Sequence, residues 1–135
     1  VMNFAEGTRF TRAKHRAQRS PYRHLLKPKA GALALALDVL GDRFDALLDV
    51  TIVYPDGAPT FWHFLCGNLR RVVVRAQRIP IPEDLRRGDY AHDPKYRKAF
   101  QHWLQELWAD KDRQIDTLLG VSAPALPAAP EAVPA

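Results

Sequence analysis

The chain has 135 residues, enough for one domain, and 47% of them are hydrophobic, which is enough for a packed core. It has no run of about eighteen apolar residues, so the sequence predicts no segment that spans a bilayer. A single cysteine, Cys66, excludes an internal disulfide framework and fits a reducing compartment. We interpret Cys66 as a small buried hydrophobe.

The net charge of +5 is concentrated near the N-terminus, where no acidic residue lies between Glu6 and Asp38. The basic residues of this run are Arg9, Arg12, Lys14, Arg16, Arg19, Arg23, Lys27 and Lys29. Such a run attracts phosphate groups, whether on anionic lipids, coenzyme A or nucleic acid. For most of these residues a solvated basic loop is the preferred interpretation, and only Arg9, Lys14 and Lys29 are singled out individually.

The first elements are a strand end, a turn and a helix. The apolar residues 1–4 are expected to end a strand, so the sequence indicates a chain that continues upstream, with no signal-peptide pattern before Val1. Residues 12–24 show weak periodicity, with a break predicted at Ser20-Pro21. Residues 29–40 predict a helix that is apolar nearly all round and therefore buried. Gly41 is expected to end this helix in the left-handed conformation.

Two further strands flank a short aromatic segment. Residues 46–54 form a nearly continuous apolar run, which predicts a strand buried on both faces of a parallel sheet. Residues 60–65 predict a short helix or turn. Its aromatic side chains, Phe61, Trp62 and Phe64, are interpreted as core, with a ridge that contacts acyl chains or a membrane as the alternative. Residues 71–79 predict the next strand.

The C-terminal part begins with a charged, irregular segment, residues 83–92. Asp93-Pro94 then predicts the start of a long helix. The apolar stripe of this helix consists of Phe100, Trp103, Leu104, Leu107, Trp108, Ile115, Leu118 and Leu119. Core packing is the expected role of the stripe, and a helix lying flat on a membrane is the alternative. Residues 121–135, almost all Ala and Pro, are expected to be a disordered tail, which leaves 1–120 as the domain.

Several short motifs resemble the glycerophospholipid acyltransferases of the lysophosphatidic acid acyltransferase family. The central one is Phe4-Ala5-Glu6-Gly7-Thr8-Arg9, with Ala5 where that family usually has proline. Together with Thr11 and Lys14-His15 it is similar to the branch of lysocardiolipin acyltransferases and their bacterial relatives. The other matching stretches are Leu25–Lys29, Asp49–Asp56, Ile79-Pro80, Trp103-Leu104 and Lys111-Asp112, and one departure is Gly31, one position earlier than the family's glycine.

This resemblance implies the second, C-terminal half of a glycerol-3-phosphate acyltransferase-like α/β domain, with three strands alternating with helices. It implies acyl transfer from acyl-CoA or an acyl carrier protein to a lysophospholipid hydroxyl, at the cytoplasmic face of a bacterial inner membrane. Arg9 is expected to hold the acceptor's phosphate, because its planar guanidinium donates two parallel bonds. Glu6 would orient Arg9 or the glycerol, Gly7 and Thr8 would supply backbone donors, and Lys14 and Lys29 would add positive charge.

The same family uses a histidine as general base, with an aspartate five residues later. None of the five histidines here has that partner: the residues five positions on are Ser20, Lys29, Asn68, Arg97 and Leu107. We therefore expect the catalytic pair upstream and the isolated chain to be inactive.

The sequence carries no metal-ligand pattern, phosphate-binding glycine loop or nucleophile triad, and we expect no cofactor. Two alternatives stay open. One is a basic module that binds nucleic acid, although the basic run lacks a helix-turn-helix, zinc or aromatic-stacking signature. The other is a catalytically dead scaffold that binds anionic lipid.

Overall fold

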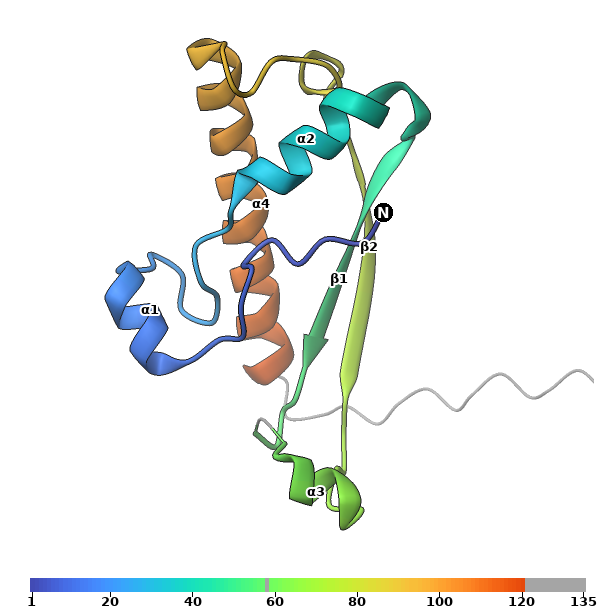
Figure 1. Ribbon diagram of the computed structural model, residues 1–135. Coiled ribbons are helices and arrows are strands. Elements are labelled where there is room, and N and C mark those ends of the chain that lie inside the picture. Colours follow the sequence, from blue (N-terminus) through green and yellow to red (C-terminus); the bar gives the residue numbers. More distant parts are fainter. Residues whose placement is uncertain (58, 121–135) are drawn as a thin grey trace, which may run out of the picture.

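The computed structural model describes residues 1–57 and 59–120 (Figure 1). Its elements, in chain order, are α1 (Arg12–Gln18), α2 (Ala30–Leu40), the 3-10 turn η1 (Gly41–Arg43), β1 (Ala46–Val53), α3 (Phe61–Leu65), β2 (Val73–Pro80), the 3-10 turn η2 (Glu83–Leu85) and α4 (Pro94–Gly120). Helix α4 runs alongside the long hairpin of β1 and β2, and α2 crosses near one end of both (Figure 1). This mixture of helix and strand agrees with the α/β class. The predicted tail lies outside the described residues.

The sheet of the described chain has two strands and is antiparallel, so the expectation of a parallel sheet is wrong. The register runs from Ala46 opposite Pro80 to Val53 opposite Val73. Helix α4 covers only one side of the hairpin. Thr51 and Val53 are therefore buried, while the alternate side chains Leu48, Val50 and Ile52 are exposed, which corrects the prediction of burial on both faces.

The predicted strand at residues 1–4 is not formed. The side chains of Val1, Met2 and Phe4 are all highly exposed, and no neighbouring strand pairs with them in the described chain. The apolar run alone suggested a strand, but an isolated segment has no ladder partner for its backbone groups. The motif that follows therefore lies on an irregular segment and not at the end of a strand.

The core lies between α2, α4 and the two 3-10 turns. Its most deeply buried side chains are Ala34 and Leu37 of α2 with Phe100 and Leu104 of α4. This confirms core packing for the centre of the α4 stripe. Helix α2 is buried on one side only, since Leu35 and Val39 on its other side are exposed, and the expectation of an all-round buried helix is wrong.

The start of α4 is capped as predicted, whereas the end of α2 differs from the prediction. The Asp93 carboxylate caps α4, because its Oδ1 accepts the backbone N–H groups of Lys95 at 2.9 Å and Tyr96 at 3.3 Å. Gly41 has a right-handed φ of −54°, so it is not the expected left-handed cap. It is glycine for another reason: a Cβ there would lie 1.9 Å from the carbonyl oxygen of Arg86. The predicted irregular segment 83–92 is thus packed closely against η1.

Helix α3, predicted at residues 60–65, is formed at the far end of the hairpin from α2 (Figure 1). Core packing of its aromatic side chains is wrong, because Phe61, Trp62 and Phe64 are all more than 60% exposed. Cys66, at the end of α3, is also exposed and is not the buried hydrophobe that we expected.

Candidate functional site

The predicted motif forms a tight turn. The N–H of Gly7 donates to the carbonyl oxygen of Phe4 at 2.8 Å, and Gly7 has a φ of +68°. This left-handed conformation strains any residue with a Cβ, so the turn itself favours glycine. The turn sets the direction in which the side chains of Glu6 and Thr8 leave the backbone.

Two lysines converge on this turn. Lys14, from the first turn of α1, donates from Nζ to the hydroxyl of Thr8 at 2.5 Å. Lys29, which precedes α2, donates its backbone N–H to the carbonyl oxygen of Ala5 at 2.7 Å. The side chain of Lys29 lies across Gly7, where a Cβ would be 3.3 Å from its Cδ and Nζ atoms. The structure thus brings together Gly7, Thr8, Lys14 and Lys29.

Glu6 turns inward from the same turn. Its Oε1 accepts the backbone N–H of Leu26 at 3.2 Å. Burial raises the pKa of the Glu6 carboxyl above its usual value, while the Leu26 hydrogen bond and the nearby side chains of Trp108 and Lys111 oppose the rise. Glu6 therefore ties the motif to the Leu25–Lys29 segment.

Arg9 is the motif residue that stands apart. It is exposed, and its guanidinium has no ion pair or hydrogen bond with the described residues. Its predicted role as phosphate ligand, and the role of Glu6 in orienting it, stay predictions. The structure gives Glu6 a different partner and leaves Arg9 able to reorient.

Helix α1 was missed by the sequence reasoning. Its N-terminus is capped by Thr11, whose Oγ1 accepts the backbone N–H of Lys14 at 3.2 Å, and Arg19 ends it in the left-handed conformation. A threonine ahead of the basic run was the available signal. The helix places Arg12 and Arg16 one turn apart, on the same face.

These arginines line a groove of about 660 Å³ between α1, the end of β1 and the end of α4. The groove has a polar and an apolar part. Its lining residues are Glu6, Arg12, His15, Arg16, Arg23 and His24, with Phe10, Leu25, Ile52, Val53, Tyr54, Ile115 and Leu119. An elongated ligand with an anionic head and an apolar body would match this division. Arg12, Arg16 and Arg23, which we interpreted as a solvated loop, therefore join the candidate site.

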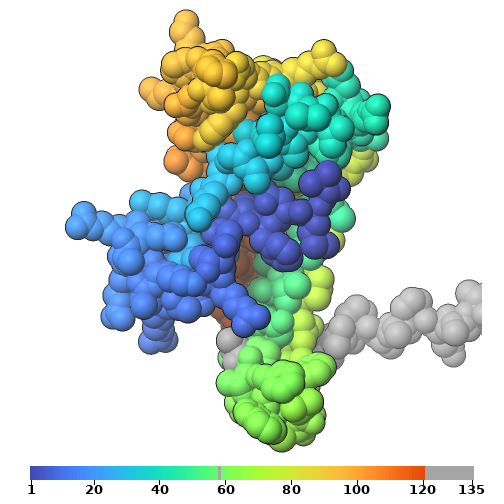
Figure 2. Space-filling view, viewed as in Figure 1, coloured from blue at the N-terminus to red at the C-terminus, as the bar shows by residue number. Residues whose placement is uncertain are grey.

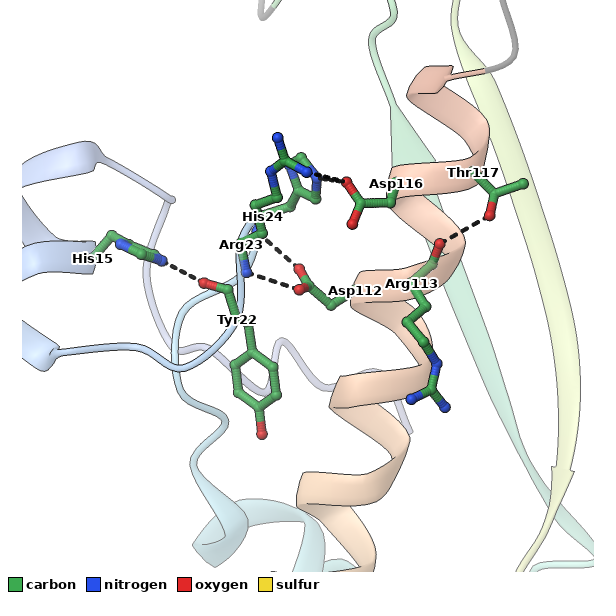
Figure 3. A network of polar contacts seen from close by, with 8 residues as sticks. All are labelled: His15, Tyr22, Arg23, His24, Asp112, Arg113, Asp116 and Thr117. Carbon is green, nitrogen blue, oxygen red and sulfur yellow. Dashed lines mark hydrogen bonds and ion pairs between the residues drawn. The ribbon is translucent and has the colours of Figure 1, made fainter.

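The basic segment is fixed to α4 by a polar network (Figure 3). The Asp112 carboxylate accepts the backbone N–H groups of Arg23 and His24, both at 2.8 Å. Asp116 bonds His24 Nε2 at 2.8 Å and pairs with Arg23 at 3.3 Å. The His24 bond, with Arg23 adding to it, lowers the pKa of the Asp116 carboxyl. Sequence periodicity gave no signal for these contacts.

The two histidines that line the groove make hydrogen bonds within the protein. His15 Nε2 lies 2.6 Å from the carbonyl oxygen of Tyr22, and His24 is bound to Asp116. Within residues 1–57 and 59–120, no group of three His, Cys, Asp or Glu side chains is placed to hold a metal ion. In the same residues no helix is both long and apolar enough to cross a bilayer. The site offers cationic and hydroxyl groups that suit a phosphate.

Comparison with known proteins points to the acyltransferases. The chain is 30% identical over 127 residues to lysocardiolipin acyltransferase 1 of Danio rerio, covering 85% of this chain and 30% of that protein. It is 27% identical to the same enzyme of Gallus gallus, over 85% of this chain and 31% of the relative. It is also 27% identical to 1-acyl-sn-glycerol-3-phosphate acyltransferase epsilon of Mus musculus, over 82% of this chain and 33% of the relative.

No family model and no solved structure matches the chain. The chain spans about a third of the length of the relatives named above. Their similarity supports the glycerophospholipid acyltransferase family that the motif indicated. The bacterial branch and the division into domain and tail stay predictions.

Proposed function

We propose that this chain supplies the acceptor-binding part of an O-acyltransferase. The enzyme would move a fatty acyl group from acyl-CoA or an acyl carrier protein to the free hydroxyl of a lysophospholipid such as 1-acyl-glycerol-3-phosphate. The observation that carries the proposal is the convergence of Lys14 and Lys29 on the Gly7-Thr8 turn. A localisation at the cytoplasmic face of the inner membrane belongs to the same proposal.

The cationic side chains around the Gly7-Thr8 turn are suited to a phosphate. A phosphate monoester is held best by several charge-assisted donors on fixed supports. Here Lys14 is supported by α1 and Lys29 by its backbone bond to Ala5, and the hydroxyl of Thr8 accepts a hydrogen bond from Lys14. Arg9, exposed beside this group, would swing onto the phosphate and add a bidentate contact. The adjacent groove would take the apolar part of the acceptor.

The chemistry needs a general base that this sequence does not supply. His15 and His24 are engaged in structural hydrogen bonds, and no histidine has an aspartate five residues later. The proposal therefore requires the base to come from residues outside this sequence. The role of this chain is to hold the acceptor so that its hydroxyl arrives oriented, which lowers the entropic part of the barrier.

Binding of a short-chain 1-acyl-glycerol-3-phosphate to the chain, measured by isothermal titration calorimetry, tests the proposal. Loss of one charge-assisted contact costs about 1.5–3 kcal/mol, so Lys14→Ala and Lys29→Ala should each weaken binding by roughly 10- to 150-fold. Lys27→Ala is the matched control, since Lys27 is exposed in the same basic segment and, among the residues that the structure describes, its side chain has no hydrogen bond or ion pair with the motif. A monoacylglycerol, which lacks the phosphate, should bind far more weakly.

The same titrations separate the alternatives. Equal losses for Lys27→Ala and Lys29→Ala would contradict a defined phosphate site and favour diffuse electrostatic attraction. Tight, steeply salt-dependent binding of random-sequence RNA, unaffected by the lysophospholipid, would support the nucleic-acid module instead. Acceptor binding without acyl transfer by the complete protein would support the lipid-binding scaffold.

A further inference from the structure

Helix α3 presents apolar side chains to solvent at the end of the hairpin. The exposed fractions are 72% for Phe61, 71% for Trp62, 64% for Phe64 and 56% for Leu65. Figure 2 shows this tip projecting beyond the body formed by the other elements. These four apolar side chains lie next to one another on one short helix, so they form a contiguous patch and not scattered surface residues. Such exposed patches mark interaction sites.

The tip is built to hold these side chains outward. The Oγ1 of Thr60 accepts the backbone N–H of His63 at 3.3 Å, and the His63 ring returns to Thr60, which together cap the helix. Gly67, with a φ of +68°, ends the helix and turns the chain into the approach to β2. The one polar side chain of α3 is thus used by the cap, and its apolar side chains stay outside.

Charge around the tip is positive. The sequence has no acidic residue between Asp56 and Glu83, while Arg70, Arg71 and Arg75 lie on the return path from α3. Arg71 is 4.0 Å from Asp56, whereas Arg70 has no ion-pair partner within the described residues. Aromatic side chains with flanking arginines are the combination that the interface of an anionic bilayer attracts.

The tip also lies at the same end of the hairpin as the basic groove. The groove is lined by Ile52, Val53 and Tyr54, which end β1 and lead into the loop before α3. Its arginines Arg12 and Arg16 therefore add positive charge at that end of the molecule. A lipid surface that met the tip would stand close to the mouth of the groove.

We propose that α3 is an interfacial anchor that inserts Phe61, Trp62, Phe64 and Leu65 into the headgroup region of an anionic phospholipid bilayer. The inserted rings supply the apolar contact, and the surrounding arginines supply attraction to negative lipids. The anchor does not require acyl transfer to occur in this protein, so its test is independent of the proposed acceptor site.

The unique cysteine makes the test specific. Cys66 is the single cysteine of the chain, is exposed and directly follows α3, so an environment-sensitive fluorophore attached there reports on the tip alone. With vesicles of phosphatidylglycerol and phosphatidylcholine, we expect a blue-shifted, brighter emission that spin-labelled lipids quench. With pure phosphatidylcholine vesicles the response should be weaker, because the electrostatic part is lost.

Vesicle co-sedimentation gives the second readout. The triple variant Phe61→Ser, Trp62→Ser, Phe64→Ser should lower partitioning by about tenfold or more, since the buried apolar area is removed. Leu35→Ser is the matched control, because Leu35 is 63% exposed but lies on α2, at the other end of the hairpin. This variant should bind vesicles as the unaltered chain does.

Three results would overturn the anchor. One is co-sedimentation of the triple variant equal to that of the unaltered chain. Another is vesicle binding with no change in emission at Cys66, which would assign binding to the basic segment alone. The third is concentration-dependent dimerisation in sedimentation equilibrium that the triple variant abolishes, which would make the patch a contact between two copies of this chain.

Discussion

Two regions of this molecule differ in how much polar contacts add to apolar packing. Helix α2 and the first half of α4 are joined by apolar burial, with Leu37, Phe100 and Leu104 almost completely shielded from solvent. The basic segment that leads from the motif to His24 is joined to α4 by the Asp112 carboxylate, which accepts the backbone N–H groups of Arg23 and His24, and by a smaller apolar cluster of Tyr22, Leu25, Val53 and Ile115. The first region is the main core, and the second is an exposed basic segment attached to that core.

The difference between the two regions shows how a basic segment can be ordered while its side chains stay exposed. Residues that must stay cationic and accessible cannot be fixed by burial, because desolvation of an unpaired charge is costly. Fixing the backbone instead, through Asp112 and through Glu6 to Leu26, leaves the side chains of Arg12, Lys14 and Lys29 exposed. Arg23 pairs with Asp116, whereas Arg12, Lys14 and Lys29 are held in place without an ion pair to the described residues.

The largest expected effect breaks the first region. Phe100 is fully buried and packs its ring against Tyr90, Tyr96 and Trp103. Phe100→Ala should lower the free energy of unfolding by about 3–5 kcal/mol, because it leaves a cavity that the surrounding rings fill only in part. Urea denaturation followed by circular dichroism measures this loss. The exposed Phe61→Ala should change the same quantity by less than about 0.5 kcal/mol, and equal losses would contradict the core described above.

A smaller effect breaks the second region and leaves the first intact. Asp112→Ala removes the acceptor of two backbone N–H groups, those of Arg23 and His24, at a cost of about 1.5–3 kcal/mol to the attachment of the segment. Hydrogen exchange of these two amides should accelerate, while the amides around Phe100 keep their protection.

Asp110→Ala is the control on the same helix, since Asp110 pairs with Arg113 on the surface and not with the basic segment in the described residues. It should leave exchange at Arg23 and His24 unchanged. If Asp112→Ala instead accelerated exchange of the amides around Phe100 as much as that of Arg23 and His24, the two regions would unfold as one cooperative unit.

The same contrast explains what the sequence could predict. Periodicity and capping residues predicted α2, β1, α3, β2 and α4 to within a few residues, because apolar spacing and caps are local signals. They did not predict on which side of β1 the core lies, since that depends on which helix covers the hairpin. The exposed rings of α3 were assigned to the core for the same reason.

At the site, the motif residues were found from their resemblance, and the structure adds what resemblance lacks. It places Lys14 on Thr8 and Lys29 on Gly7, and it adds Arg12, Arg16 and Arg23 around the groove. The bonds from Asp112 join residues almost ninety positions apart in the chain, so no local pattern encodes them. Gly41 shows the same limit, since its need for glycine comes from the distant carbonyl of Arg86.

The smallest expected effect concerns Glu6, and it sharpens the contrast between the two regions. Unlike the exposed basic side chains, the Glu6 carboxylate is partly desolvated. Burial raises the pKa of its carboxyl above the usual 4.5. At a pH between 4.5, the usual pKa, and the raised pKa of the folded chain, the folded chain binds more protons than the unfolded chain. The free energy of unfolding therefore falls as the pH rises through that window. Glu6→Gln keeps an oxygen that accepts the Leu26 N–H and has no charge to desolvate.

The difference in stability between the two proteins should therefore be smallest below pH 4.5 and grow in favour of Glu6→Gln as the pH rises above it. Urea denaturation at a series of pH values measures this difference. Asp89 and Asp116, whose pKa values are lowered, lose their stabilising contribution only as the pH falls below their usual range, and they do so equally in both proteins. A difference that stays constant with pH would mean that the pKa of Glu6 is the same in the folded and the unfolded chain, which would contradict a net desolvation of its carboxylate.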